Sequence, residues 1–111
     1  MAYDLTLAER VRTFLKNELD IEEKKMFGGL AFMVDNHMCI GVRADMLMAR
    51  IDPDLYNEAL AKPFVKKMDF TGKPLKGFIY IEAKGIETDE RLSYWINLSF
   101  EFVKSLPPKT K

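Results

Sequence analysis

The sequence has one cysteine, one histidine and no net charge, and each of these features limits its chemistry. Cys39 cannot form an internal disulfide, which predicts a protein of a reducing, cytoplasmic compartment. Lys and Arg together number 17, as do Asp and Glu. Domains that bind duplex DNA usually carry a basic excess, so we expect no tight direct contact with nucleic acid. No apolar run is long enough to span a membrane, and we expect neither a signal peptide nor a membrane anchor.

The length and composition fit one small folded domain over residues 1–111. Hydrophobic residues make up 48% of the chain and charged residues 31%, which is typical of a globular protein. A chain of this size buries enough apolar surface to fold without a metal or a disulfide. We therefore expect a core built from hydrophobic packing alone.

The hydrophobic pattern predicts an α+β, two-layer sandwich in which an antiparallel sheet packs on helices. Asp4, or Thr6 with Glu9, can cap the first helix, and Asp52 and Thr88 begin the other two. The expected order is a helix over 4–19, strands over 25–34, 38–44 and 46–51, a short helix ending by 62, strands over 64–70 and 77–83, and a helix over 88–106.

Two adjacent glycines lie inside the first predicted strand, in Met26-Phe27-Gly28-Gly29. Glycine weakens a strand interior and contributes no side chain to the packing. The pair therefore predicts a bulge, a sharp bend or another element lying close against the backbone. We expect a structural role for these four residues.

Three stretches carry a resemblance to a known family. They are Met26-Phe27-Gly28-Gly29, Asn36-His37-Met38-Cys39-Ile40-Gly41-Val42 and Met68-Asp69-Phe70-Thr71-Gly72-Lys73-Pro74-Leu75-Lys76-Gly77. In this order they resemble the TfoX/Sxy N-terminal domain family, and the resemblance covers essentially the whole chain.

The resemblance implies a fold similar to that of secretion chaperones, with an antiparallel sheet on helices. Long members of the family are regulators of DNA uptake and competence genes. They are thought to act with the cyclic-AMP receptor protein, and they carry a second, C-terminal helical domain. A chain of 111 residues has no room for that domain, so we expect a short stand-alone member. The family supplies no agreed catalytic residues.

Motifs for catalysis, metals and cofactors are incomplete in this sequence. Thr71-Gly72-Lys73 is followed by Pro74, where a phosphate-binding loop needs Ser or Thr. His37 and Cys39 have a spacing that would begin a metal site or a thiolate–imidazole pair, but a structural zinc site needs four ligands. We expect an exposed His37, a buried Cys39, no metal, no cofactor and no catalytic residue.

The strand patterns look apolar on both faces of the sheet. If Ile79, Ile81 and Ala83 pack under the last helix, alternation places Phe78 and Tyr80 on the opposite face. Together with Met46 and Met48 they form a candidate interface, and a symmetric homodimer is the simplest way to bury it. In the alternative, the loop around Thr71 folds over this face and the protein is a monomer.

Two function classes follow from these observations. The first is a non-enzymatic interaction module, regulatory in role, that binds another protein or a second copy of itself. The second is a small enzyme or small-molecule-binding protein with a pocket at the sheet edge. The incomplete motifs favour the first class.

Overall fold

One sheet and the helices around it make up most of the described chain. The computed structural model describes residues 3–16, 21–26, 28–34, 37–68 and 77–106. In chain order the elements are α1 (Leu5–Leu15), β1 (Ile21–Met26), β2 (Gly29–Val34), β3 (His37–Arg43), β4 (Met46–Arg50), η1 (Pro53–Leu55), α2 (Tyr56–Leu60), β5 (Val65–Lys67), β6 (Phe78–Ile81), η2 (Ala83–Ile86) and α3 (Asp89–Ser105).

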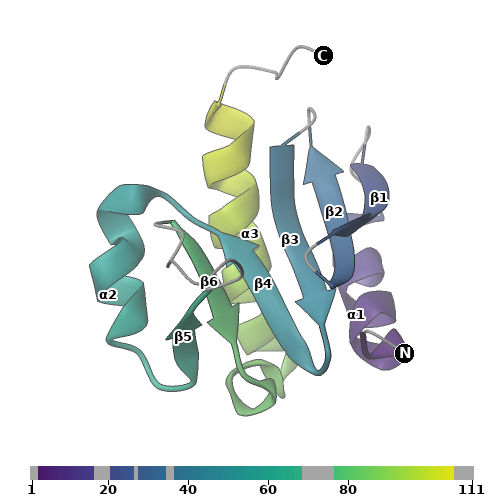
Figure 1. Ribbon diagram of the computed structural model, residues 1–111, viewed down its shortest axis with the longest axis horizontal. Helices are drawn as coiled ribbons and strands as arrows, with labels where there is room; N and C mark the ends of the chain where they lie inside the picture. Colours follow the sequence, from purple (N-terminus) through teal and green to yellow (C-terminus); the bar gives the residue numbers. More distant parts are fainter. Residues whose placement is uncertain (1–2, 17–20, 27, 35–36, 69–76, 107–111) are drawn as a thin grey trace.

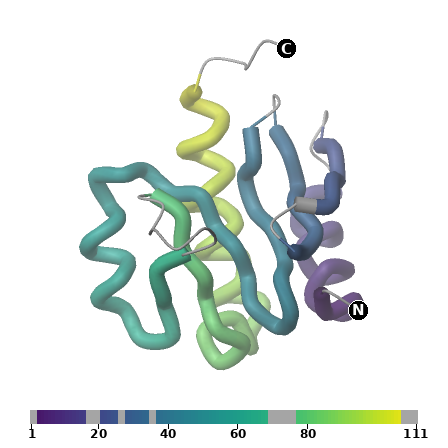
Figure 2. Tube along the Cα trace, viewed as in Figure 1, coloured from purple at the N-terminus to yellow at the C-terminus, as the bar shows by residue number. Residues whose placement is uncertain are grey.

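The strands form a six-stranded antiparallel sheet in the order β1-β2-β3-β4-β6-β5. Helices α1 and α3 pack against each other and against β3 on one face, and α2 lies beside β5 at the sheet edge (Figure 1). Strands β4 and β6 lie side by side although α2 and β5 separate them along the chain (Figure 2). The predicted α+β class, with helices at both ends and in the middle, is confirmed.

The predicted capping residues begin the helices, and the structure decides between the two alternatives for the first helix. The Asp4 carboxylate accepts hydrogen bonds from the backbone N–H groups of Thr6 and Leu7, so Asp4 caps α1 and the Thr6–Glu9 box does not. Asp52 accepts from the N–H of Asp54, and Thr88 accepts from that of Arg91. These contacts satisfy backbone donors that have no partner within their helices.

The boundaries of two predicted strands are wrong. The strand expected over 25–34 is two strands, β1 and β2, because Gly28 turns the chain back with a φ of +75°. The strand expected over 77–83 ends at Ile81, and Ala83 begins the short helix η2. The predicted loop at 71–74, the end of the first helix at 17–19 and the stop at 107–108 lie outside the described residues.

Hydrophobic side chains pack on both faces of the sheet. The face toward α1 and α3 holds the larger cluster, which contains Ile79 and Ile81 together with residues of the last helix, as predicted. The prediction is wrong for Ala83, which is exposed because it begins η2 and no longer follows the alternation of the strand. The opposite face holds a smaller cluster, which we call the methionine face. Its members are Ala31, Met33, Met38, Met48, Met68 and Tyr80, with Met46 and Phe78 packed against them.

Candidate functional site

The glycine pair has a role in the backbone conformation, and it lies at the turn between two strands instead of inside one. Gly28 forms the turn between β1 and β2, and a β-carbon there would lie 3.3 Å from Nε of Arg43. A β-carbon on Gly29 would overlap the carbonyl oxygen of Val42 in the neighbouring strand. Met26 pairs with Gly29 across the turn, and Phe27 lies outside the described residues. These glycines therefore allow a close approach of β2 to β3.

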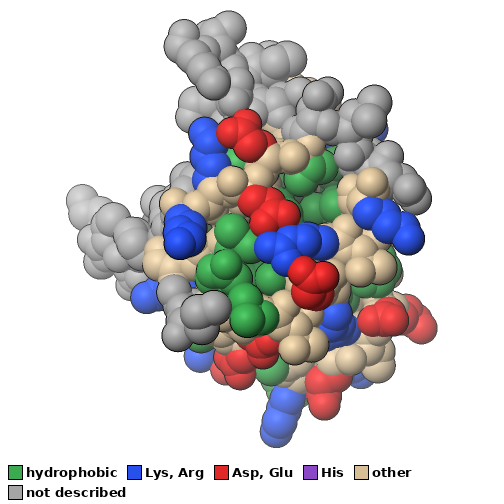
Figure 3. Space-filling view, turned by 90° about the vertical axis from the view of Figure 1, so that its right-hand side faces the viewer, with side chains coloured by type: hydrophobic (Ala, Val, Ile, Leu, Met, Phe, Trp, Pro, Cys, Tyr) green, Lys and Arg blue, Asp and Glu red, His purple; other side chains and the backbone are tan. Residues whose placement is uncertain are grey.

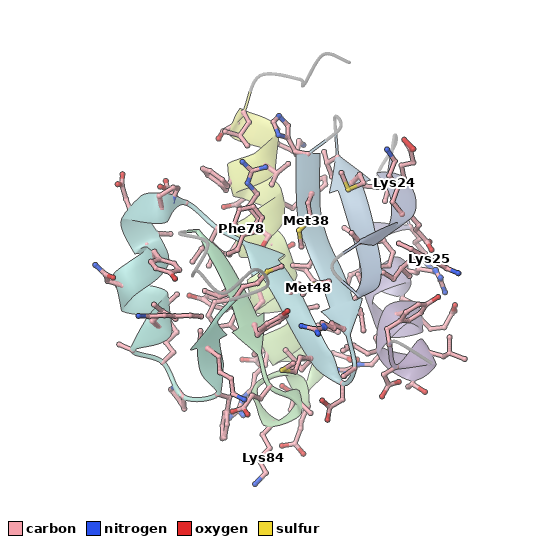
Figure 4. All side chains as sticks on the ribbon, viewed as in Figure 1. Lys24, Lys25, Met38, Met48, Phe78 and Lys84 are labelled. Atoms are coloured by element: carbon pink, nitrogen blue, oxygen red, sulfur yellow. The ribbon has the colours of Figure 1, made fainter. Side chains whose placement is uncertain are left out.

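The methionine face is less open than the sequence predicts. Phe78 and Tyr80 do lie on the face turned away from α3, as do Met38 and Met48 (Figure 4). The expected exposure is wrong for two of the candidate interface residues, since Met48 is 0% and Tyr80 6% exposed. Met46 and Phe78 are half-buried. A partner would meet only the last two at the surface, and their interface role stays a prediction.

The hydroxyl of the buried Tyr80 has a charged hydrogen-bond partner. Nη1 of Arg43 donates to the Tyr80 hydroxyl at 2.9 Å, across the full width of β4. Arg43 also lies against Gly28, so a single side chain joins the glycine turn to the methionine face. A hydrogen bond in which the donor is charged is stronger than one between neutral groups. Arg43 therefore holds the Tyr80 hydroxyl within its own chain through this hydrogen bond.

His37 and Cys39 do not form a shared site. The pairing of β2 with β3 shifts between Phe32 and Met33, which leaves Cys39 as an extra residue in β3. Its thiol is 0% exposed in the helix-side core, and burial raises its pKa to about 12. His37 is half-buried at the start of β3, with Nδ1 3.3 Å from Nη1 of Arg50. A thiol with this pKa is a poor nucleophile at neutral pH.

The raised pKa of Cys39 predicts a loss of stability in alkali. Its ordinary value is 9.0, and the folded state holds the proton up to about 12. This contribution is complete below pH 9.0 and disappears as the pH rises toward the folded value. Between these limits the free energy of unfolding should fall by about 1.4 kcal/mol per pH unit. Urea denaturation of wild type and Cys39→Ala at several alkaline pH values measures it. Equal pH slopes for the two proteins would contradict the prediction.

A groove that the sequence did not predict lies between α2 and α3. Its main hollow has a volume of about 470 Å³, and a smaller hollow of about 230 Å³ adjoins it. Lys62, Tyr94 and Trp95 line both, so we treat them as one α2–α3 groove. The remaining lining residues are Pro63, Phe64, Gly85, Glu90 and Arg91 in the main hollow, and Leu55, Glu58, Ala59 and Leu98 in the smaller one.

Phe64 is placed in the groove by an unusual backbone conformation. Its φ is +67°, a region that costs a non-glycine residue roughly 1–3 kcal/mol. The carbonyl oxygen of Phe64 accepts a hydrogen bond from the N–H of Glu82 at 2.8 Å, next to the pairing of β5 with β6. Gly85 leaves room beneath it, since a β-carbon there would lie 3.1 Å from that of Phe64. The surrounding structure therefore holds the ring at the surface, 38% exposed.

Two neighbouring aromatic residues of α3 give the groove an apolar wall. Trp95 is 5% exposed and belongs to the core, whereas Tyr94 is 48% exposed. Their rings meet edge to face, with centroids 5.0 Å apart. Nζ of Lys62 lies 5.7 Å from the Tyr94 ring centroid, within the range of a cation–π contact. The wall therefore combines a buried indole with an exposed phenol beside a positive charge.

One residue in the sequence, Tyr94, could have indicated an exposed aromatic surface here. The buried stripe of the last helix passes through Leu92, Trp95 and Ile96, and Tyr94 lies off it. An aromatic residue off the buried stripe is exposed by periodicity alone. Nothing in the pattern indicates the left-handed backbone at Phe64, because that depends on the pairing of β5 with β6 and on Gly85.

The surface on the side of α1 and β1 shows no separation of charge. Basic and acidic side chains alternate there around hydrophobic ones (Figure 3). Arg12 contacts both Glu9 and Glu23, and Arg10 lies 3.4 Å from Asp89. The guanidinium of Arg12 lowers the pKa of Glu23. On this side Arg10, Arg12 and Lys24 each lie next to a carboxylate.

The described residues contain neither a metal-binding cluster nor a helix suited to a membrane. Within those residues, no three His, Cys, Asp or Glu side chains come together in a way that would hold a metal ion. None of the described helices has both the length and the apolar character needed to cross a bilayer.

Comparison with known proteins assigns the fold to a family. No curated protein and no solved structure matches the chain. Residues 14–103 match the family described as the TfoX N-terminal domain. The match covers the sheet and nearly all of α3, and it confirms the resemblance of the sequence motifs. The chain therefore belongs to the TfoX N-terminal domain family.

Proposed function

We propose that this protein is a non-enzymatic interaction module with a regulatory role, and that it binds a segment of a partner protein in the α2–α3 groove. The observation that carries the proposal is the pair of exposed aromatic rings, Phe64 and Tyr94, beside a hollow of about 470 Å³. Exposed aromatic side chains at a concave surface are typical anchors for protein partners.

The groove favours a segment with a large apolar side chain next to an acidic residue. Phe64, Tyr94 and Trp95 supply apolar contact area. Lys62 and Arg91 put two positive charges on the main hollow, against one negative charge from Glu90. In the main hollow this excess of positive charge favours an acidic neighbour of the anchor, whereas Glu58 balances Lys62 in the smaller hollow.

The wider setting of the proposal rests on composition. A formal net charge of +0 supports a module that acts through proteins, with no direct contact to nucleic acid. A single, buried cysteine supports a reducing, cytoplasmic location. A titration with duplex DNA at moderate salt is the matching control, and we expect no saturable binding near nanomolar protein.

A small molecule in the same groove is the second candidate. The volume of about 470 Å³ falls within the usual range of ligand sites, and the groove lies beside the edge strand β5. A ligand of this kind would stabilise the native state by mass action. Thermal melting with a library of cytoplasmic metabolites tests it, with Tyr94→Ala as the variant that should lose the response.

The partner proposal predicts that Tyr94→Glu weakens binding at least about tenfold. The change puts a negative charge on the exposed ring position and removes the cation–π contact of Lys62. Tagged wild type and Tyr94→Glu are compared by affinity capture, and each captured protein is then purified and titrated against both. We expect a saturable complex with wild type and a loss of at least about tenfold in affinity for the variant.

Leu5→Glu is the matched control, because Leu5 is 52% exposed on α1 and lies outside the groove. It should bind like wild type. Light scattering of the protein alone identifies the occupant as a second copy if a dimer mass is lost only in Tyr94→Glu. Binding that survives Tyr94→Glu, or that Leu5→Glu removes equally, would overturn the assignment to this groove.

A further inference from the structure

Arg50 lies where the central strands of the sheet separate. The pairing of β3 with β4 extends only as far as Ile40 and Ala49, one residue before Arg50. On its other side Arg50 pairs with Phe78 of β6. The side chain also reaches Phe102, in the last turns of α3. This place is at the opposite end of α3 from the α2–α3 groove, whose aromatic wall is near the start of the helix.

Two aromatic rings flank the guanidinium of Arg50. Its Cζ lies 5.3 Å from the ring centroid of Phe78 and 5.9 Å from that of Phe102. Both rings and the arginine are half-buried. Aromatic rings stack on the flat face of a guanidinium, and its N–H donors point outward within the plane. The rings therefore fix the orientation of the group without using its donors.

Among the described residues, no carboxylate forms an ion pair with Arg50. In the part of the chain that the structure describes, Nη1 of Arg50 lies 3.3 Å from Nδ1 of His37. Arg10 and Arg12, by contrast, have Asp89 and Glu23 as partners. Burial lowers the pKa of Arg50 below its ordinary value, as expected for a cation taken partly out of water. A half-buried, oriented guanidinium with open donors is suited to an external anion.

We propose that Arg50, held between Phe78 and Phe102 and next to His37, forms a binding site for a carboxylate. We call this site the Arg50 notch. The planar fork of a guanidinium matches both oxygens of a carboxylate group. A monoanion fits better than a phosphate dianion, because one arginine supplies the charge and the nearby end of α3 is the negative end of the helix dipole.

Binding of acetate, followed by nuclear magnetic resonance at constant ionic strength, tests the Arg50 notch. Sodium acetate replaces sodium chloride in steps, and the side-chain signals of Arg50 and His37 are recorded in wild type. We expect saturable shifts of both signals. Arg50→Met keeps an unbranched apolar stem between the rings and removes the donors, so its affinity should fall at least about tenfold. Arg10→Met is the matched control, since Arg10 already has Asp89 as its partner.

Arg50→Lys provides a second variant if Arg50→Met does not fold. It keeps the charge but loses the fork, and it should bind acetate more weakly than wild type. A capped aspartate peptide and free acetate form two arms of the titration. Tighter binding of the peptide identifies a protein carboxylate as the source, and tighter binding of acetate identifies a small acid. Linear shifts without saturation, equal shifts with chloride, or tighter binding of phosphate would each overturn the proposal. None of these outcomes depends on the α2–α3 groove.

Discussion

Replacement of Gly29 by alanine is expected to lower the free energy of unfolding by about 3 kcal/mol or more, at the upper end of the overpacking range. The added β-carbon would overlap the carbonyl oxygen of Val42 and lie 3.0 Å from its carbonyl carbon. Both atoms belong to the backbone of β3, so no rotation of a side chain can relieve the overlap. The strands β2 and β3 must separate locally, with loss of their hydrogen bonds.

Gly28→Ala is the matched control for this prediction. Its β-carbon would meet the flexible side chain of Arg43, which can move away. The cost that remains is that of a left-handed backbone, about 1–2 kcal/mol. Urea denaturation of the two variants measures both values. If Gly28→Ala lowers the free energy of unfolding as much as Gly29→Ala does, or more, the prediction is wrong. The main role of the pair would then be the turn conformation and not the close approach to Val42.

Met48→Ala is expected to lower the free energy of unfolding by about 2–5 kcal/mol. Met48 is 0% exposed, and its Cε lies in the space that a side chain on Gly41 would take, 2.6 Å from the position of that β-carbon. Gly41 and Met48 face each other across β3 and β4. Truncation therefore leaves a cavity that Gly41 cannot fill.

Met46→Ala is the control, since Met46 lies on the same strand and is half-buried. Met46→Ala should lower the free energy of unfolding clearly less than Met48→Ala does. Chemical denaturation of the monomer, with the mass checked by light scattering, separates a core role from an interface role. An unchanged midpoint for monomeric Met48→Ala would restore Met48 as an interface residue.

The element order could be predicted from the sequence because each signal for it is local. Asp52 before Pro53 begins the short helix, and Thr88 begins α3, through contacts within three residues. The sequence indicates a structural role for the glycine pair but places it inside one strand, whereas it lies at the turn between β1 and β2. The apolar stretch that starts at Met26 and runs into β2 looks continuous, and the sequence pattern does not show that Gly28 adopts a φ of +75° and reverses the chain there.

The candidate sites could not be predicted because they depend on contacts between distant residues. Alternation places Tyr80 on the face away from α3, but it does not indicate the hydrogen bond of Tyr80 with Arg43, which is 37 residues away. The groove brings Phe64 over Gly85 and beside Tyr94, and the notch brings Arg50 to Phe102. Periodicity indicates which face of an element a residue occupies, but it does not indicate which distant residues pack against that face.

The isolated thiol of Cys39 gives the protein a reporter of its own opening. Because the side chain is 0% exposed at the centre of the sheet, a thiol reagent can reach it only when β3 parts from its neighbours or the fold opens. Where reclosing outpaces modification, the labelling rate measures the equilibrium population of open molecules, and where modification is faster it measures the opening rate. Varying the reagent concentration distinguishes the two regimes. The chain thus carries an unmodified probe for the kinetics of its sheet, without an added dye or a foreign residue.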